Sequence, residues 1–199
     1  MDTMKELIEE CLKDILSAEK QFVKAMPKLA KAAQSPQLKQ ALETHLAETQ
    51  EQVKRLEACL KEMGIKPSGV FCHGAAGIVE EMNEHLKGAK PSPVTDAMVI
   101  GLAQKGEHYE ICAYGTVFEY MKACGMNDAV ERLKQNMAEE EKTDKLLSGL
   151  AESEINPAAA NAVVPEEKPK KATSARRPAA TSSATNGKAR SPRSKVSVR

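Results

Sequence analysis

The sequence predicts an all-α fold, a four-helix bundle in which a long crossover joins two antiparallel helix pairs. Three observations support this prediction. Apolar residues recur every three or four positions along four long segments, as on the buried face of an amphipathic helix. The chain has no Trp and only three Phe and three Tyr, so its core must be aliphatic, which favours helices over a sheet. Gly, Pro and Ser are concentrated between the segments, where turns are expected.

The first helix is expected over residues 3–33. Leu12 and Phe22 lie on its apolar stripe together with the aliphatic residues between and beyond them. Pro27 lies inside this segment and should kink the helix, because proline cannot donate a backbone hydrogen bond.

The second helix is expected over residues 36–63. Ser35 and Pro36 have the order of an N-cap followed by proline at the first helical position, where its missing N–H costs nothing. Gly64 supplies the C-cap, since glycine readily adopts the left-handed conformation that ends many helices.

The second helix pair follows a long connection over residues 64–92, which should contain a short helix over 74–86. A third helix is expected from Thr95 and Asp96 to residue 124. Asn127 or Asp128 should cap a fourth helix that reaches residue 150. One long connection between two hairpins is typical of ferritin-like bundles.

The predicted bundle domain covers residues 1–152, and residues 153–199 form a predicted disordered basic tail. The last 32 residues carry ten Lys and Arg and no Asp or Glu, which leaves 19 basic and 28 acidic residues, a net charge of −9, in residues 1–167. A tail without an apolar face cannot offset its ordering entropy. Residues 168–199 could bind nucleic acid non-specifically through phosphates, or could be a solvated linker.

Cysteine usage and hydropathy favour a reduced, cytoplasmic protein. Five Cys residues are present without a CxxC pair, the N-terminus lacks the pattern of a signal peptide, and no apolar run approaches the ~18 residues of a membrane span. No membrane partner is therefore expected. Cys72, in the connection, is the best candidate for an exposed thiol, and the other four lie near apolar faces.

Carboxylates interrupt the apolar stripe of all four long helices. A buried carboxylate is costly unless it is paired, protonated or bound to a metal ion. Ferritin-like dimetal proteins place one or two such ligands inward on each of four helices, and oxygen ligands with an occasional imidazole suit iron or manganese. The candidate ligands of a dinuclear Fe or Mn centre are Glu19, His45, Glu48, Glu107, Glu110, Glu140 and Asp144.

An alternative is that these carboxylates lie at the edges of the stripes and reach water, because long helices with 29% charged residues produce such positions by chance. The usual Glu-x-x-His pairs are also absent from the second and fourth helices. Glu51 and Glu141 offer competing registers to the ligands on those two helices. Tyr114 lies one turn after Glu110 and either donates a hydrogen bond to a carboxylate of the site or is an ordinary core tyrosine.

Several strings of the sequence resemble the YciE/YciF-like family of bacterial stress-response proteins. They include Ser17-Ala-Glu-Lys-Gln21, His45-Leu-Ala-Glu-Thr49, Glu107-His-Tyr-Glu-Ile111, and Glu139-Glu140 with Asp144. The resemblance covers residues 3–151. It implies a rubrerythrin-related ferritin-like bundle, often a homodimer, with a dimetal centre. Carried over position by position, it selects the same seven candidate ligands and favours Glu140 over Glu141.

The prediction for function is a stress-associated protein whose dinuclear iron or manganese centre reacts with peroxide or O2, or handles iron. Whether it is an enzyme is left open. The alternative is a non-enzymatic homodimeric module that the basic tail tethers to DNA, RNA or another anionic partner.

Overall fold

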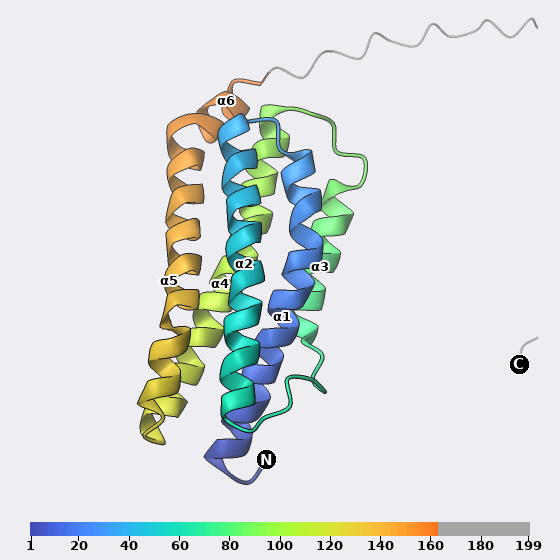
Figure 1. The fold of residues 1–199 in the computed structure, drawn as a ribbon. Helices are drawn as coiled ribbons and strands as arrows, with labels where there is room; N and C mark the ends of the chain where they lie inside the picture. Colours follow the sequence, from blue (N-terminus) through green and yellow to red (C-terminus); the bar gives the residue numbers. More distant parts are fainter. Residues whose placement is uncertain (163–199) are drawn as a thin grey trace, which may run out of the picture. The chain divides into compact units, whose positions relative to one another are not determined.

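Residues 1–162, the part of the chain that this computed structural model describes, form helices and no strand (Figure 1). The elements in order are α1 Met4–Ala32, α2 Pro36–Glu62, α3 His73–Leu86, α4 Pro93–Ala123, α5 Asn127–Leu150, the π-helix η1 Ala151–Ile155, and α6 Asn156–Ala160. Helix α1 packs on α2 and α4 packs on α5, while contacts of α1 with α4 and of α2 with α5 complete the bundle. The predicted class, two antiparallel pairs with a helix in the crossover, is confirmed.

Local signals in the sequence set the ends of the first two helices. Thr3 forms a capping box with Glu6, in which the Thr3 hydroxyl accepts from the Glu6 N–H at 3.2 Å and the Glu6 carboxylate accepts from the Thr3 N–H at 3.0 Å. Ser35 caps α2 ahead of Pro36, as expected. Gly64 follows α2 with a φ of +74°, a conformation that favours glycine. Helix α1 continues through Pro27 to its end.

The two helices of the second pair, α4 and α5, are capped by other residues than those expected from the sequence. Helix α4 starts at Pro93, because the hydroxyl of Ser92 accepts from the Thr95 N–H at 3.1 Å and so caps the helix two residues earlier. Helix α5 starts at Asn127, so the prediction that Asn127 or Asp128 caps it is wrong. Both residues lie in its first turn, and its N-cap makes no side-chain hydrogen bond.

A buried carboxylate joins the two helix pairs at one end of the bundle. Asp96, in the first turn of α4, accepts hydrogen bonds from the backbone N–H groups of Gln34 at 2.6 Å and of Ser35 at 2.9 Å. These two residues form the turn between α1 and α2. The side chain thereby satisfies two N–H groups that lie outside any helix, and fixes this turn against α4.

The crossover helix α3 packs on α1 and α4 and is held by a buried cysteine. Cys72 is only 1% exposed, so the prediction that it is an exposed thiol is wrong. Its sulfur caps α3 by accepting from the Ala75 N–H and lies 2.8 Å from the Tyr109 hydroxyl. Because Tyr109 donates its proton to Asp14 at 2.7 Å, the thiol of Cys72 donates to Tyr109. Cys112, expected near an apolar face, is exposed instead.

The interior of the bundle contains a polar layer with one apolar cluster on each side of it along the bundle axis, and a third, smaller apolar cluster lies where α3 packs on α1. The cluster at the N-terminal end of α1 includes Ile8, Leu12, Leu56, Val117 and Leu133. The cluster at the opposite end includes Leu29, Leu38, Leu42, Val99 and Leu147. Between these two sets, the buried side chains are polar on α2, α4 and α5, and on α1 they include Glu19. The two clusters supply the apolar burial that stabilises the bundle and isolate the polar layer from water along the bundle axis.

Helical structure continues past residue 152, where the sequence places the end of the bundle domain. The π-helix η1 and α6 pack on α4, and Ile155 is buried among the residues of the second apolar cluster. Because this short segment buries one apolar side chain, it does not show the repeating apolar pattern from which a helix is predicted. The rest of the predicted basic tail, residues 163–199, lies outside the described residues.

Candidate metal centre

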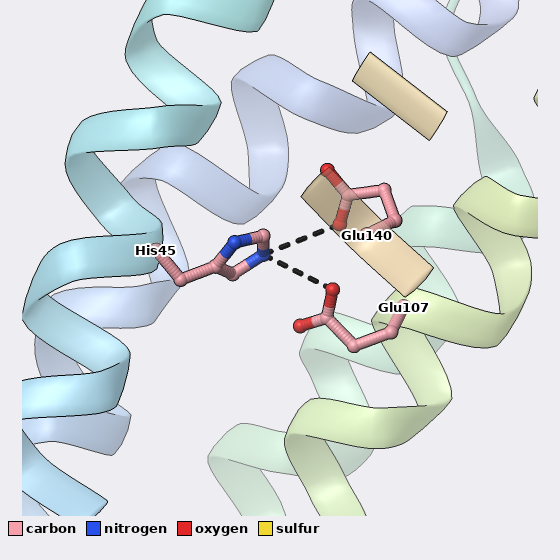
Figure 2. Close-up of side chains that lie close together, drawn as sticks. All are labelled: His45, Glu107 and Glu140. Carbon is pink, nitrogen blue, oxygen red and sulfur yellow. Dashed lines mark ion pairs between the residues drawn. The ribbon is translucent and has the colours of Figure 1, made fainter. Parts of the chain in front are cut away.

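Five of the seven candidate ligands lie in the polar layer. Glu19 of α1, His45 of α2, Glu107 and Glu110 of α4, and Glu140 of α5 each have at most 4% of their surface exposed. The ligand atoms of His45, Glu107 and Glu140 lie within 4.8 Å of one another. The Nε2 atom of His45 is 3.0 Å from Glu107 Oε2 and 3.3 Å from Glu140 Oε2, between the two carboxylates (Figure 2).

Most of the ligand atoms in this layer have no hydrogen-bond partner among the described residues. The contacts of His45 Nε2 with the two carboxylates are ion pairs when the imidazole is protonated, and Nε2 makes no hydrogen bond. The unpartnered buried atoms at the centre are Glu19 Oε2, His45 Nε2, Glu107 Oε2, Glu110 Oε1 and both carboxylate oxygens of Glu140. A buried polar atom without a partner costs about 1–3 kcal/mol, and more when it is charged. Cations bound among these atoms would satisfy them together, so the residues fit a metal centre.

The hydrogen bond on the far side of His45 suits a metal ligand. The Nδ1 atom of His45 lies 3.0 Å from the hydroxyl of Thr143, one turn after Glu140 on α5. When Nδ1 carries the proton and donates to Thr143, the lone pair of Nε2 faces Glu107 and Glu140. A partner on one ring nitrogen is how proteins hold an imidazole in the tautomer that binds metal through the other.

The charges of the layer are strongly coupled. Burial raises the pKa of Glu107 to about 8, despite the nearby imidazole. Burial, and then repulsion by neighbouring carboxylates, holds the pKa values of Glu19 and Glu110 well above their ordinary range. Burial alone would also raise the pKa of Glu140, but its contacts with His45 and Glu107 hold that pKa below its ordinary value. The layer therefore retains protons that bound cations would displace.

The structure places Glu48 at the edge of the bundle rather than in the layer. Its carboxylate pairs with Lys142 and lies 3.8 Å from His45 Nδ1, and its side chain is 22% exposed. Its contact with His45 outweighs burial and, with the Lys142 ion pair, lowers the pKa of Glu48 to about 2. Glu51, the alternative register on this helix, is exposed and pairs with Lys54.

Asp144 also lies outside the layer, near the surface. Its carboxylate accepts a hydrogen bond from Gln104 Nε2 at 2.9 Å and lies 3.0 Å from the Nε2 atom of the exposed His108. On α5 it follows Thr143, which faces inward to His45, so Asp144 is turned outward by the helical step of about 100° per residue.

Tyr114 donates a hydrogen bond to Glu19, a carboxylate of the polar layer, which is the first of the two possibilities that its position allowed. Its hydroxyl lies 2.6 Å from Glu19 Oε1 and accepts from Asn136 Nδ2 at 2.7 Å. Arg55 in turn donates to Asn136 Oδ1 at 2.7 Å. Glu19 is therefore held in place by a chain of hydrogen bonds that ends at a side chain partly exposed to solvent.

Sequence reasoning missed the neutral residues of the layer. Gln52, Asn136 and Thr143 are at most 2% exposed. Gln52 donates to Glu139 at 3.0 Å and has an unpartnered Oε1, and it lies seven residues after His45, on the same face of α2. Asn136, Glu140 and Thr143 have the i, i+4, i+7 spacing of one face of α5. This helical spacing of polar residues is the feature of the sequence that could have identified these neutral residues as inward-facing.

No helix within residues 1–162 is long and apolar enough to cross a membrane.

Comparisons with known proteins agree with this architecture. The family model described as Domain of unknown function (DUF892) matches residues 3–160. Protein YciF of Escherichia coli is 37% identical over 162 residues, which are 81% of this chain and 98% of YciF.

Three solved structures share the fold. The E. coli stress protein YciF has a TM-score of 0.74 at 37% identity, over 78% of this chain and 99% of that one. YcfI from Rhodopseudomonas palustris has a TM-score of 0.72 at 38% identity, over 74% and 94%. A protein from Xanthomonas campestris, with 18% identity, a TM-score of 0.61 and coverage of 76% and 92%, shows likeness of fold alone. The chain belongs to the DUF892 family and is a relative of YciF, as the resemblance in its sequence implied.

Proposed function

We propose that the protein is a ferritin-like, stress-associated protein with a dinuclear iron or manganese centre in the polar layer of its bundle. The observation that carries the proposal is the set of unpartnered, buried ligand atoms from all four long helices. Glu19, His45, Glu107, Glu110 and Glu140 would hold the ions. The description of the E. coli relative as a stress protein supports the physiological setting.

When bound, iron or manganese would supply redox chemistry toward peroxide or O2, or the centre would take up iron. The protein's own residues have three tasks. The carboxylates and His45 bind the ions. Thr143 orients the imidazole, and the chain through Tyr114 orients Glu19. The two apolar clusters exclude water from the layer, which strengthens electrostatic interactions within it. The resemblance to the family also leads us to propose a homodimer.

The test is the metal content of the full-length protein, purified without a metal-chelating tag and loaded anaerobically with Fe(II) or Mn(II). Wild type should bind about two ions per chain. Glu110→Gln removes a buried ligand and should lower this number. Asp144→Asn, a neutral amide in place of a carboxylate outside the layer, should not. A folded wild-type protein that remains empty after loading would contradict the proposal.

A second role is favoured by the ten basic residues of positions 168–199. We propose that this segment binds nucleic acid through phosphates without sequence preference. A chain that ends at residue 162 retains every described helix, so it should keep its metal content and lose binding to duplex DNA at low salt. Equal DNA binding by the shortened and full-length chains would assign the contact to the bundle and refute this role.

A further inference from the structure

A small apolar cavity lies directly beside the polar layer. It measures about 30 Å³, and fourteen residues from α1, α2, α3 and α4 line it. Only three of them are polar, namely His45, Glu107 and Glu110, and all three are proposed ligands of the centre. Figure 2 shows His45 and Glu107, two of these three, facing one another. The remaining lining residues are apolar, and the cavity is partly open to the outside.

The crossover helix and a glycine form this space. Ile78, Val79 and Met82 of α3 wall it on one side. On α4, Gly106 lines it next to Glu107, and a Cβ built at Gly106 would lie 3.7 Å from the ring of Phe22, an ordinary contact distance. The packing would therefore accept a methyl group at this position, and its absence leaves part of the cavity open.

The chemistry of the lining selects its occupant. A buried water molecule or a peroxide needs two to four hydrogen-bonding partners. The only polar side chains in reach are the three proposed ligands, whose lone pairs are committed when ions are bound. Peroxide in this space would therefore lose its hydration without compensation, whereas an apolar gas loses very little. Apolar cavities lined by aliphatic and aromatic side chains bind apolar molecules such as xenon.

We infer that this cavity holds a small apolar molecule of the dioxygen class against the centre, and that peroxide is excluded from it. The role of the centre rests on the proposed function, but the cavity is present without metal. Of the two oxidants that the sequence leaves open, the structure thus favours O2.

The first test uses xenon, which binds where dioxygen would and needs no metal. Crystals of the metal-free, full-length protein pressurised with xenon should show one xenon atom beside Phe22 and Glu107. Gly106→Ala should abolish it. Gly101→Ala is the matched control, because Gly101 lies on the same helix, has no atom within 4 Å of a built Cβ, and gains the same helix propensity.

Xenon that is absent from wild type, or that persists in Gly106→Ala, would overturn the inference. The outcome is separate from that of the proposed function, since metal content is measured independently. A protein that binds metal but no xenon retains its centre and loses the gas site. A protein that binds xenon but no metal retains the gas site and contradicts the proposed metal centre.

The second test asks whether peroxide enters. Met82 lines the cavity and is 3% exposed, Met121 is buried in the other apolar cluster, and Met4 is 43% exposed. Hydrogen peroxide transfers one oxygen atom to a thioether to give a sulfoxide and water. In protein loaded with redox-inert Zn(II), which occupies the lone pairs of the proposed ligands, Met82 should be oxidised as slowly as Met121 and far more slowly than Met4, as measured by peptide mass spectrometry. Oxidation of Met82 well ahead of Met121 would show that peroxide reaches the cavity and would refute its exclusion.

Discussion

Single residues of the polar layer differ in whether they are proposed ligands or hold a proposed ligand in place. Tyr114 is fully buried, and its hydroxyl is the partner of both Glu19 and Asn136. Burial raises the pKa of Tyr114 well above its ordinary value, so its proton remains available for the hydrogen bond to Glu19. Tyr114 therefore holds the Glu19 carboxylate in position and does not itself bind an ion. Removing the hydroxyl alone separates this role from metal binding.

Tyr114→Phe should lower the free energy of unfolding of the metal-free protein by about 1–3 kcal/mol, because it leaves two buried polar groups without their partner. Urea unfolding followed by circular dichroism measures this change. Tyr120→Phe is the control, since Tyr120 is partly buried on the same helix and makes no side-chain hydrogen bond within the described residues. Equal effects of the two substitutions would show that the hydrogen bond to Glu19 contributes no stability.

At the scale of elements, the crossover helix α3 has a role beyond connecting the two pairs. It walls the apolar cavity and is fixed at its start by the contacts of Cys72 with Tyr109 and of Tyr109 with Asp14. The ring of Tyr109 also meets Phe22 edge to face, with centroids 6.4 Å apart. The position of α3 and the shape of the cavity therefore depend on the same tyrosine.

Gly74→Ala should displace Tyr109, because a Cβ at residue 74 would lie 2.8 Å from the edge of its ring. Overpacking of this kind costs about 1–3 kcal/mol. On the same helix, Gly77 has no atom within 4 Å of a built Cβ, so Gly77→Ala should be neutral or stabilise by about 0.4–1 kcal/mol. Thermal unfolding of both variants compares the two changes. Gly74→Ala with a stability equal to that of Gly77→Ala would show that Tyr109 moves at no cost.

Across the bundle unit, the polar layer links stability to protons. The pKa of Glu107 is about 8 in the folded protein, against an ordinary value of 4.5, and burial and repulsion raise those of Glu19 and Glu110 as well. Burial alone would lower the pKa of His45. The adjacent carboxylates have a larger, opposite effect and hold this pKa well above its ordinary value. Between the ordinary and the raised pKa values of these groups, the folded state binds more protons than the unfolded state. Rising pH therefore favours unfolding.

The metal-free protein should accordingly become less stable as pH rises from about 4.5 to about 8, the interval between the unfolded and folded pKa values of Glu107. Urea unfolding at intervals across this range measures the slope. Glu107→Gln removes one titrating group and should reduce this slope, while Glu19, Glu110 and His45 continue to contribute to it. A stability that is constant or rises between pH 5 and 8 would contradict the assignment of protons to the layer.

Metal ions should have the opposite effect on the bundle. A cation that binds the folded state at a concentration 1,000 times its dissociation constant stabilises by about 4 kcal/mol. Fe(II) or Mn(II) should therefore raise the midpoint of unfolding of wild type most at high pH, where fewer protons compete for the ligands. Glu140→Gln should remove most of this increase. Potassium chloride at the same ionic strength is the control, because a monovalent cation adds screening without the charge of a divalent ion.

Much of the fold and part of the candidate metal centre follow from the sequence, because helical periodicity is local. Apolar spacing was enough to predict the four long helices and the crossover helix, and the polar residues in the stripes pointed to His45 and to the four carboxylates of the polar layer, although not to its neutral residues. These five interrupt the apolar stripe between two buried runs, so any packing of four such stripes would turn them inward.

Tertiary packing decided what lies at the edges of those stripes. Glu48 and Asp144 are within one turn of inward residues, but ion pairs and hydrogen bonds with neighbouring helices draw them to the surface. Cys72 is buried because α3 lies over α1 and α4, and the apolar cavity exists because α3 faces the gap left by Gly106. Periodicity specifies the direction of a side chain from its own helix, whereas burial, partners and empty space depend on the helix that arrives opposite it.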